Sequence, residues 1–431
     1  MKRLFYIIVI LFFFKNAFAE NYFQFYIKSA LENNLKLNAE RKNQKSIEQN
    51  INISRSEFLP SISLSGNQSS SQSTKKTDQS GSSLPDSSLD TETKTISVDQ
   101  KIFQGFKGLN SLKKSELEVK QANFKLKQVE QQTILDSTSA YFDLIFKNKN
   151  EKFNLSNVNL FERQVESDNA RLQKGEITLT DLAQSESSLA GANANLIKAK
   201  TELQASKTNF ERVIRKKAPN SIEENERVMI ELPDTLNEAI NIVKSNNLDL
   251  LIAKLDYQIA EKNLNIEKAK LSPSATLNYS KSENRDYSTT VDELDEETVK
   301  ATITWPIIKG GENISSIKKS SLKKQQSLLL AEDAENKVVT ETTNAWSKYQ
   351  SSESVLVATE TQLKAAEIAN EGITLEYDSG NTRTTLEVIQ SRSLLLESRI
   401  AFAKAERDYI ISKFELAFQL GTLSLGSIKA L

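Results

Sequence analysis

Carboxylates are the main groups in this chain that could do chemistry, since it has 57 aspartate and glutamate residues but neither cysteine nor histidine. That absence excludes serine–histidine triads, cysteine–histidine dyads and histidine-ligated metal sites. No nucleotide-binding loop or basic stretch typical of nucleic-acid binding occurs, and the net charge is −1. Carboxylate-only catalysis or metal binding stays open, but no pattern favours it. We expect no enzyme, no cofactor, no metal and no nucleic-acid partner.

Two of the acids stand at matching places in the chain. Thr178 precedes Asp181 and Thr384 precedes Glu387, in each case by three residues. This spacing is typical of a capping box, in which the acid closes the start of a helix. Both segments are therefore expected to begin helices, whatever else the acids do.

The first residues indicate export from the cytoplasm. Lys2 and Arg3 precede an apolar run over residues 4–14, and Ala17-Phe18-Ala19 gives the small-residue pattern of a cleavage site. A membrane anchor needs about twenty apolar residues, so this run is too short for one. Residues 1–19 are expected to be a signal peptide.

The remaining chain is internally duplicated. Asn33-Asn34-Leu35 recurs as Asn246-Asn247-Leu248, at a shift of 213 residues. Further along, glycines recur at a shift of 205 residues, as Gly105 with Gly310 and Gly175 with Gly380. A constant offset that changes at one place indicates duplication followed by a change in loop length.

The duplication predicts the domain organisation. We expect a first repeat over residues 20–218 with a strand pair at 59–105, a linker over 219–234, a second repeat over 235–420 with a strand pair at 273–309, and a C-terminal tail over 421–431. Each repeat is expected to contain a first helix (21–58 and 233–271), the strand pair, a very long helix (107–174 and 312–379) and, after a glycine turn, a last helix (180–217 and 384–420).

The long helices follow from what the sequence lacks. Between Gly108 and Gly175 there is no proline or glycine, so a continuous helix of about 100 Å is expected. The last helix of each half carries apolar residues every seven positions, which predicts supercoiling against partner helices. The two series are Leu182, Leu189, Leu196, Leu203 and Phe210, and Val388, Leu395, Phe402, Tyr409 and Leu416.

The strand segments alternate between apolar and polar residues. In the segment 298–308, Val299, Ile303 and Trp305 alternate with Lys300 and Thr302. Such a strand has one apolar face, which either packs on a core or contacts lipid.

Two features favour lipid over a covered sheet. Aromatic residues gather at the helix-side ends of the strands, as at a membrane interface: Phe58, Phe103, Phe106 and Trp305. The loops between paired strands, around 69–90 and 292–297, are highly polar. Because four strands cannot close a barrel and open edges are not tolerated in hydrocarbon, subunits would have to pool their strands.

Over essentially the whole mature chain, this pattern resembles the TolC family of outer-membrane efflux and secretion ducts. The most specific pieces are Lys174-Gly175-(x)4-Thr180-Asp181-Leu182-Ala183-Gln184 and Tyr377-Asp378-Ser379-Gly380-(x)2-Arg383-(x)3-Glu387-Val388-Ile389-Gln390. The resemblance implies a homotrimer, mainly α with membrane β, in which each protomer gives four long-helix segments and four strands. Together these would form a twelve-stranded barrel in the outer membrane and an α-helical barrel in the periplasm.

The resemblance also implies roles for residues at the inner tip. Tyr377 and Arg383 match residues that tie one helix pair to its neighbour, and Asp181 matches their acidic partner. Glu387 matches a carboxylate that lines the constriction, where three copies would favour cations. The turns at Lys174, Gly175 and Gly380 would dock a periplasmic adaptor and an inner-membrane transporter. The alternatives from the residues alone stay open: the two acids as caps, Arg383 as a surface charge and Tyr377 as a packing residue.

The chain departs from the family pattern at two places. Gln390 stands where close members carry a second acidic ring, and one extra residue separates Gly380 from Arg383. A weaker cation block and an altered gate are therefore expected.

The predicted function is a passive exit duct of a tripartite efflux pump or type I secretion system in the outer membrane. The alternative is a periplasmic coiled-coil scaffold without a pore, whose strands form a covered sheet.

Overall fold

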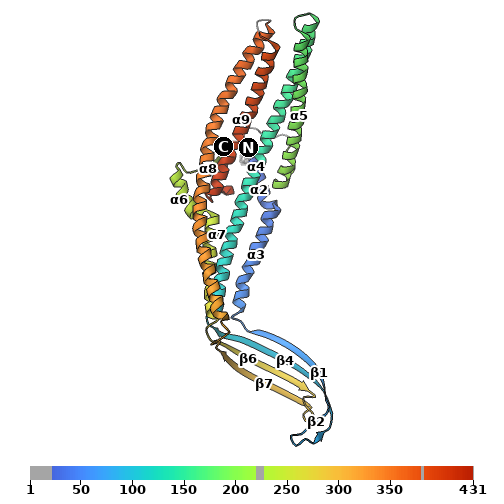
Figure 1. Ribbon diagram of the computed structural model, residues 1–431, viewed down its shortest axis with the longest axis vertical. Helices are drawn as coiled ribbons and strands as arrows, with labels where there is room; N and C mark the ends of the chain where they lie inside the picture. Colours follow the sequence, from blue (N-terminus) through green and yellow to red (C-terminus); the bar gives the residue numbers. More distant parts are fainter. Residues whose placement is uncertain (1–21, 220–227, 380–382, 431) are drawn as a thin grey trace, which may run out of the picture. The chain divides into compact units, whose positions relative to one another are not determined.

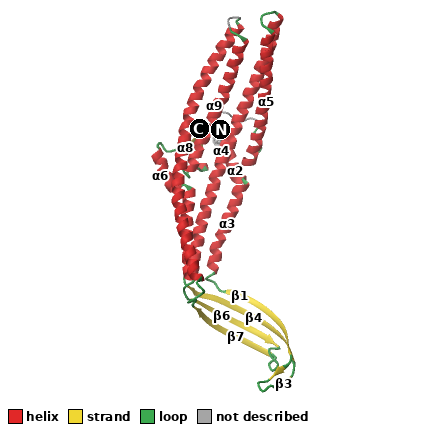
Figure 2. Cartoon of the chain, in the orientation of Figure 1, coloured by secondary structure: helices red, strands yellow, loops and turns green. Residues whose placement is uncertain are grey.

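The structure is a computed structural model that describes residues 22–219, 228–379 and 383–430. It is mostly helical, with one large antiparallel sheet (Figure 2). The expected signal peptide, residues 1–19, and Gly380 lie outside the described residues.

The two halves share one order of main elements (Figure 1). The first half has α2 (Tyr22–Asn33), α3 (Leu35–Ser56), β1 (Ser61–Ser73), β4 (Ser87–Gln104), α4 (Lys107–Gln173) and α5 (Leu179–Ile214). The second half has α6 (Leu236–Asn246), α7 (Leu248–Ala269), β6 (Ser274–Arg285), β7 (Glu293–Thr304), α8 (Glu312–Asp378) and α9 (Thr385–Gln419).

The long helices α4 and α8 have the same length, 67 residues each. Each starts just after a glycine with positive φ, Gly105 at 60° and Gly311 at 80°. At Gly105 a side chain could not be added without meeting the Ala269 carbonyl oxygen at 2.6 Å. A glycine is therefore required where the strand β4 turns into α4.

The structure corrects one expectation about the helices. The segments 21–58 and 233–271 were each expected to form one helix, but each is broken at the recurring Asn-Asn-Leu motif, at Asn34 and at Asn247. Asn34 Oδ1 accepts a hydrogen bond from the Leu37 backbone at 3.1 Å, and Asn247 Oδ1 accepts one from Leu250 at 3.1 Å. Each asparagine is thus an N-cap that starts a new helix inside an otherwise helical stretch.

The chain divides into two compact units that do not coincide with the repeats. Unit 1 comprises Met1–Arg41, Lys125–Leu251 and Ala334–Leu431, and unit 2 comprises Lys42–Phe124 and Ile252–Asp333. Each unit therefore takes residues from both halves of the duplication. Among the described residues, no helix is both long enough and apolar enough to cross a membrane.

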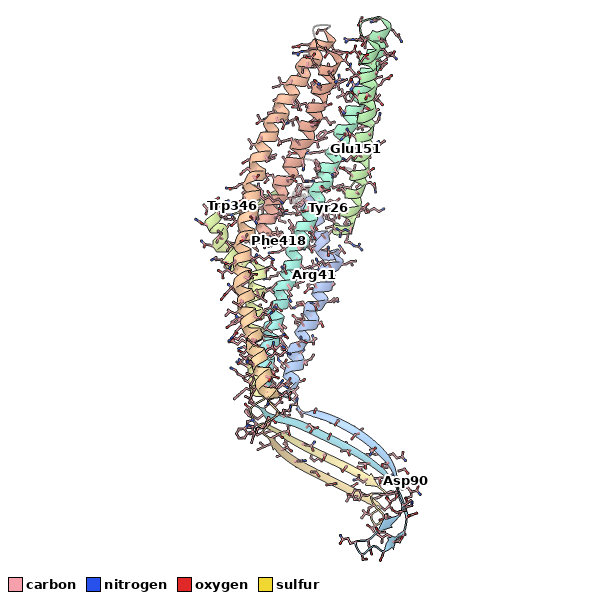
Figure 3. All side chains as sticks on the ribbon, viewed as in Figure 1. Tyr26, Arg41, Asp90, Glu151, Trp346 and Phe418 are labelled. Atoms are coloured by element: carbon pink, nitrogen blue, oxygen red, sulfur yellow. The ribbon has the colours of Figure 1, made fainter. Side chains whose placement is uncertain are left out.

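Unit 1 is held together by an aromatic core. Phe23 from α2 and Tyr141 from α4 are completely buried, with ring centroids 5.2 Å apart. Tyr26, labelled in Figure 3, packs edge-on against Phe210 of α5 at 5.1 Å. Phe414 of α9 lies 6.0 Å from Phe23. Residues from both halves thus meet in one core, and such aromatic contacts add to the free energy gained by burial.

The heptad residues of α5 point into unit 1, as their spacing predicted. Leu182, Leu196 and Phe210 are buried, and so is the row of small residues beside them: Ser185, Ala192, Ala199 and Ser206. The small row brings α5 close to α4, where Ser206 Oγ donates a hydrogen bond to Asp143 Oδ2 at 3.1 Å.

Unit 2 contains the main sheet, with strand order β1-β4-β6-β7 and antiparallel pairing throughout. The strand pairs of the two halves are joined by the pairing of β4 with β6. Within the described chain, β1 and β7 are edge strands that each pair on one side only.

Two small sheets were not expected from the sequence. β2 (Lys76–Thr77) pairs with β3 (Ser83–Leu84) in the loop between β1 and β4. β5 (Val228–Ile230), from the expected linker, pairs with β8 (Ile428–Ala430) in the expected C-terminal tail. A turn of 3-10 helix, η1 (Leu425–Ser427), precedes β8.

Candidate functional site: the sheet faces and the helix tips

One face of the main sheet carries a register-aligned row of apolar side chains. Ile62 of β1 lies opposite Val98 of β4, Val98 lies opposite Tyr279 of β6, and Tyr279 lies opposite Val299 of β7. The outer members of the row are strongly exposed, Ile62 by 74% and Val299 by 71%. Nothing in the described chain covers this apolar face, so it is available to an apolar surrounding.

The opposite face is polar along the same rows. Ser63, Ser97, Ser280 and Thr298 lie in one row across the four strands. The Ser63 and Ser97 hydroxyls lie 2.7 Å apart. A sheet with one apolar and one polar face can separate lipid from water.

Three of the predicted interface aromatics, Phe58, Phe103 and Phe106, line one hollow at the helix-side end of the sheet, and Trp305 follows the end of β7. All four are exposed: Phe58, Phe103, Phe106 and Trp305. Phe103 and Phe106 meet edge-on at 5.6 Å, and Trp305 Nε1 donates a hydrogen bond to the Leu271 carbonyl oxygen at 3.1 Å. Exposed aromatics with a satisfied polar atom suit the boundary between an apolar and an aqueous phase.

At the tips of unit 1, both expected capping boxes are present. The Asp181 carboxylate accepts the Thr178 backbone N–H at 2.9 Å, and the Glu387 carboxylate accepts the Thr384 backbone N–H at 2.8 Å. The hydrogen bond from the Thr178 backbone, and then that from the Thr178 side chain, hold the pKa of Asp181 below its ordinary value. The acids therefore start α5 and α9 as charged caps.

Arg383 joins two carboxylates at the start of α9. Its Nε donates to Glu376 Oε2 at 2.6 Å and its Nη1 donates to Glu387 Oε1 at 2.9 Å. The Thr384 backbone, and then Arg383, hold the pKa of Glu387 below its ordinary value, while Glu376 and Glu387 raise the pKa of Arg383. All three residues belong to the α8–α9 pair.

Tyr377 makes the link between the two helix pairs. It is 5% exposed, and its hydroxyl donates to Asp168 Oδ1 on α4 at 2.9 Å. The same hydroxyl lies 3.1 Å from Thr385 Oγ1. The guanidinium of Arg171 lies over the Tyr377 ring at 4.4 Å. Burial raises the pKa of the Tyr377 hydroxyl, so the hydroxyl stays protonated and remains a donor.

The remaining predicted tip residues lie apart from Tyr377. Within the described residues, no hydrogen bond joins Asp181 to Tyr377 or Arg383. Gln390 and Lys174 are exposed. Gly175 has a φ of 73° and ends α4, where its N–H donates to the Leu172 carbonyl oxygen at 2.9 Å.

Sequence reasoning missed the acid that bonds Tyr377. Asp168 follows Phe161 by seven residues, and Gln164 follows Asn157 by seven, so each continues a heptad position of α4. A carboxylate seven residues after the aromatic Phe161 was the available signal.

A cavity of about 520 Å³ lies in unit 1 between α4, α5 and α9. Its lining includes buried amides of α4, Asn154 and Asn157, and two small residues of α5, Gly191 and Ala192. Small residues such as these let another helix approach closely.

Comparisons with known proteins agree with this geometry. The sequence pattern of the family described as outer membrane efflux protein matches residues 26–214 and 239–422. The chain is 26% identical to the outer membrane efflux protein BepC of Brucella suis over 400 residues, which cover 92% of this chain and 84% of that protein. It is 24% identical to the outer membrane protein TolC of Vibrio cholerae, with 95% and 92% of the two chains covered.

Solved structures share the fold. The CmeC outer membrane channel of Campylobacter jejuni superposes with a TM-score of 0.80 at 14% identity, covering 93% of this chain and 85% of that one. A membrane protein from Pseudomonas aeruginosa superposes with a TM-score of 0.82 at 13% identity, covering 93% of both chains.

Proposed function

The chain belongs to the outer membrane efflux protein family, and from this premise we propose that three copies assemble into one passive duct whose pooled strands close a twelve-stranded barrel. As a member of this family, the protein is an exit duct of the outer membrane that extends into the periplasm. Family membership favours this role over the scaffold alternative.

The observation that carries the proposal is the aligned apolar row Ile62–Val98–Tyr279–Val299 on a sheet whose edge strands, β1 and β7, each pair on one side only within the residues that the structure describes. An apolar face needs an apolar surrounding, and a strand edge in hydrocarbon needs a partner. Joining β7 of one protomer to β1 of the next gives each strand edge a partner. The closed barrel then presents its apolar face to lipid. The polar face, with Ser97 and Thr298, then lines a water-filled lumen.

Native mass spectrometry of the detergent-solubilised mature protein tests the assembly. We expect a complex of three chains that survives dilution into detergent without added lipid. A folded monomer as the sole species would contradict the pooled barrel.

We place the contact with a periplasmic adaptor and an inner-membrane transporter at the tips. Lys174 and Gly175 directly follow α4, and the cavity lined by Gly191 and Ala192 lies in the same unit. Gly380, the third residue that the resemblance implies for docking, lies outside the described residues. Because the chain lacks cysteine, Lys174→Cys gives a single site for cross-linking. Cross-links to an adaptor, identified by mass spectrometry, are expected from this site and not from Ser73→Cys in the main sheet. The reverse pattern would contradict the placement.

Glu387 is proposed to line the constriction, one carboxylate per protomer. Glu387→Gln keeps the capping pattern, since glutamine also closes a capping box, but it removes three charges from the trimer. We expect cation preference, measured as a reversal potential in a salt gradient across a planar bilayer, to fall markedly. Gln390→Glu should strengthen the preference, because it adds a second ring of charge. An unchanged reversal potential in both variants would remove Glu387 from the constriction.

The same site predicts a pH dependence. The pKa of Glu387 is lowered in the folded protein, so its charge is present above the ordinary glutamate value of 4.5 and is lost only as the pH falls through the lower folded value. Cation preference should therefore persist at pH 4.5 and weaken below it. A loss of preference already above that pH would show that another group sets it.

A further inference from the structure

Asp168 is a buried carboxylate that receives hydrogen bonds from three helices. It lies on α4 and is completely buried. Tyr377 of α8 donates to Oδ1 at 2.9 Å, Gln164 of α4 donates to Oδ1 at 2.8 Å, and Ser185 of α5 donates to Oδ2 at 2.5 Å. A buried carboxylate is costly unless such donors compensate it, so this group depends on all three.

A half-buried arginine of α9 completes the cluster. Arg392 Nη1 donates to Gln164 Oε1 at 3.0 Å, and the other end of the Gln164 amide donates to Asp168. Gln164 therefore connects a cation on α9 with an anion on α4. We call Gln164, Asp168, Ser185, Tyr377 and Arg392 the buried latch.

The buried latch joins the α4–α5 pair to the α8–α9 pair near the tips of one protomer. Its acid sits on one pair, and Tyr377 and Arg392 sit on the other. An apolar cluster continues the contact, with Ile389 of α9 packed among Val158 and Phe161 of α4. By contrast, the hydrogen bonds of Arg383 and Asp181 stay within their own helix pairs.

We propose that Asp168 is the residue that holds the duct shut, because separating the two helix pairs would strip the buried carboxylate of its Tyr377 donor. This inference rests on the proposed channel function, in which the pairs must separate to open the inner end. It assigns the role of acidic anchor to Asp168, in place of Asp181, which the family resemblance implied and which caps the start of α5. Asp168 acts as a positioning residue and does not itself line the pore.

The first test is the open fraction of single channels in planar bilayers. Asp168→Asn keeps the shape of the side chain but removes the charge that strengthens its hydrogen bonds, so the open fraction should rise by about tenfold or more. The open fraction of Asp168→Leu should rise further, because leucine has no hydrogen-bond acceptor. The control Glu166→Gln removes a charge from an exposed side chain two residues away and should match wild type.

A second measurement separates opening from misfolding and does not need a conducting channel. Lys174 and Ser379 are exposed and directly follow α4 and α8, and the chain has no cysteine to interfere with labelling. Spin labels at Lys174→Cys and Ser379→Cys should report longer distances in Asp168→Asn than in wild type, with the melting temperature kept close to that of Glu166→Gln.

Either of two results would overturn the inference. The first is a raised open fraction in Asp181→Asn, while Asp168→Asn and Asp168→Leu keep the wild-type open fraction. Asp181 would then be the acidic anchor. The other is unchanged label distances in a folded Asp168→Leu. If no variant and no wild-type protein conducts, the channel function fails, and the label distances still decide whether Asp168 holds the helix pairs together.

Discussion

Val299→Lys should prevent the protein from accumulating in the outer membrane as a trimer, whereas Thr298→Lys should leave the amount close to that of wild type. Valine and threonine have similar sizes and shapes, and the two residues are neighbours on β7. They differ in the face they occupy: Val299 belongs to the apolar row opposite Tyr279, and Thr298 lies opposite Ser280.

The expected loss is large because the apolar face is the one that contacts lipid. A lysine near the bilayer midplane destabilises a membrane strand by about 2–4 kcal/mol, and each trimer would carry three. A lysine on the polar face would meet the water of the proposed lumen, as would Lys300, which lies on the same face two positions further on. Membrane fractionation followed by unheated gel electrophoresis measures the result. Equal accumulation of both variants, or loss of Thr298→Lys alone, would contradict the assignment of the two faces.

Tyr377→Phe alone should raise the open fraction of the channel by about tenfold or more, because a hydrogen bond to a charged acceptor contributes about 1.5–3 kcal/mol. The substitution keeps the ring, and so keeps the contact with Arg171 at 4.4 Å. It removes only the hydroxyl that donates to Asp168. The same hydroxyl also lies 3.1 Å from Thr385 Oγ1, but that contact is within the α8–α9 pair, so the bond to Asp168 is the one that joins the two pairs.

Arg383→Ser should have a much smaller effect on the open fraction. Its partners, Glu376 and Glu387, lie on its own helix pair, and exposed ion pairs contribute little. In the double variant Tyr377→Phe/Arg383→Ser, nearly all of the opening should come from Tyr377. Single-channel recordings of the three variants measure this. A large effect of Arg383→Ser alone would mean that it joins neighbouring protomers in the trimer.

The features that the sequence predicted well are those that repeat or extend over many residues. The absence of proline and glycine after Gly108 predicted the long helix α4, and the duplication predicted a second one of equal length in α8. The alternation around Val299 predicted β7 and its apolar face. Such signals are summed over a whole element, so one exceptional residue does not hide them.

The features that the sequence did not predict depend on single side chains or on distant segments. Asn34 and Asn247 break their helices by capping, although the residues around them remain helix formers. The pairing of β5 with β8 joins segments that are far apart in the chain, and neither strand is long enough to signal itself.

The buried latch was missed for a related reason. Which acid meets Tyr377 depends on how α4 is rotated about its axis, and a motif match cannot supply that rotation. The match pointed to Asp181, which the structure uses as a cap, while the heptad position of Asp168 carried the relevant information. Gly175 and Glu387, by contrast, lie in a turn and a cap that depend on nearby residues alone.

The most direct test of the channel function is the conductance of the purified mature protein in a planar lipid bilayer. The channel function predicts small discrete current steps from wild type, a preference for cations, and a higher open fraction in Tyr377→Phe. No steps from protein that is folded and trimeric would contradict it, and the apolar face of the sheet would then need another partner.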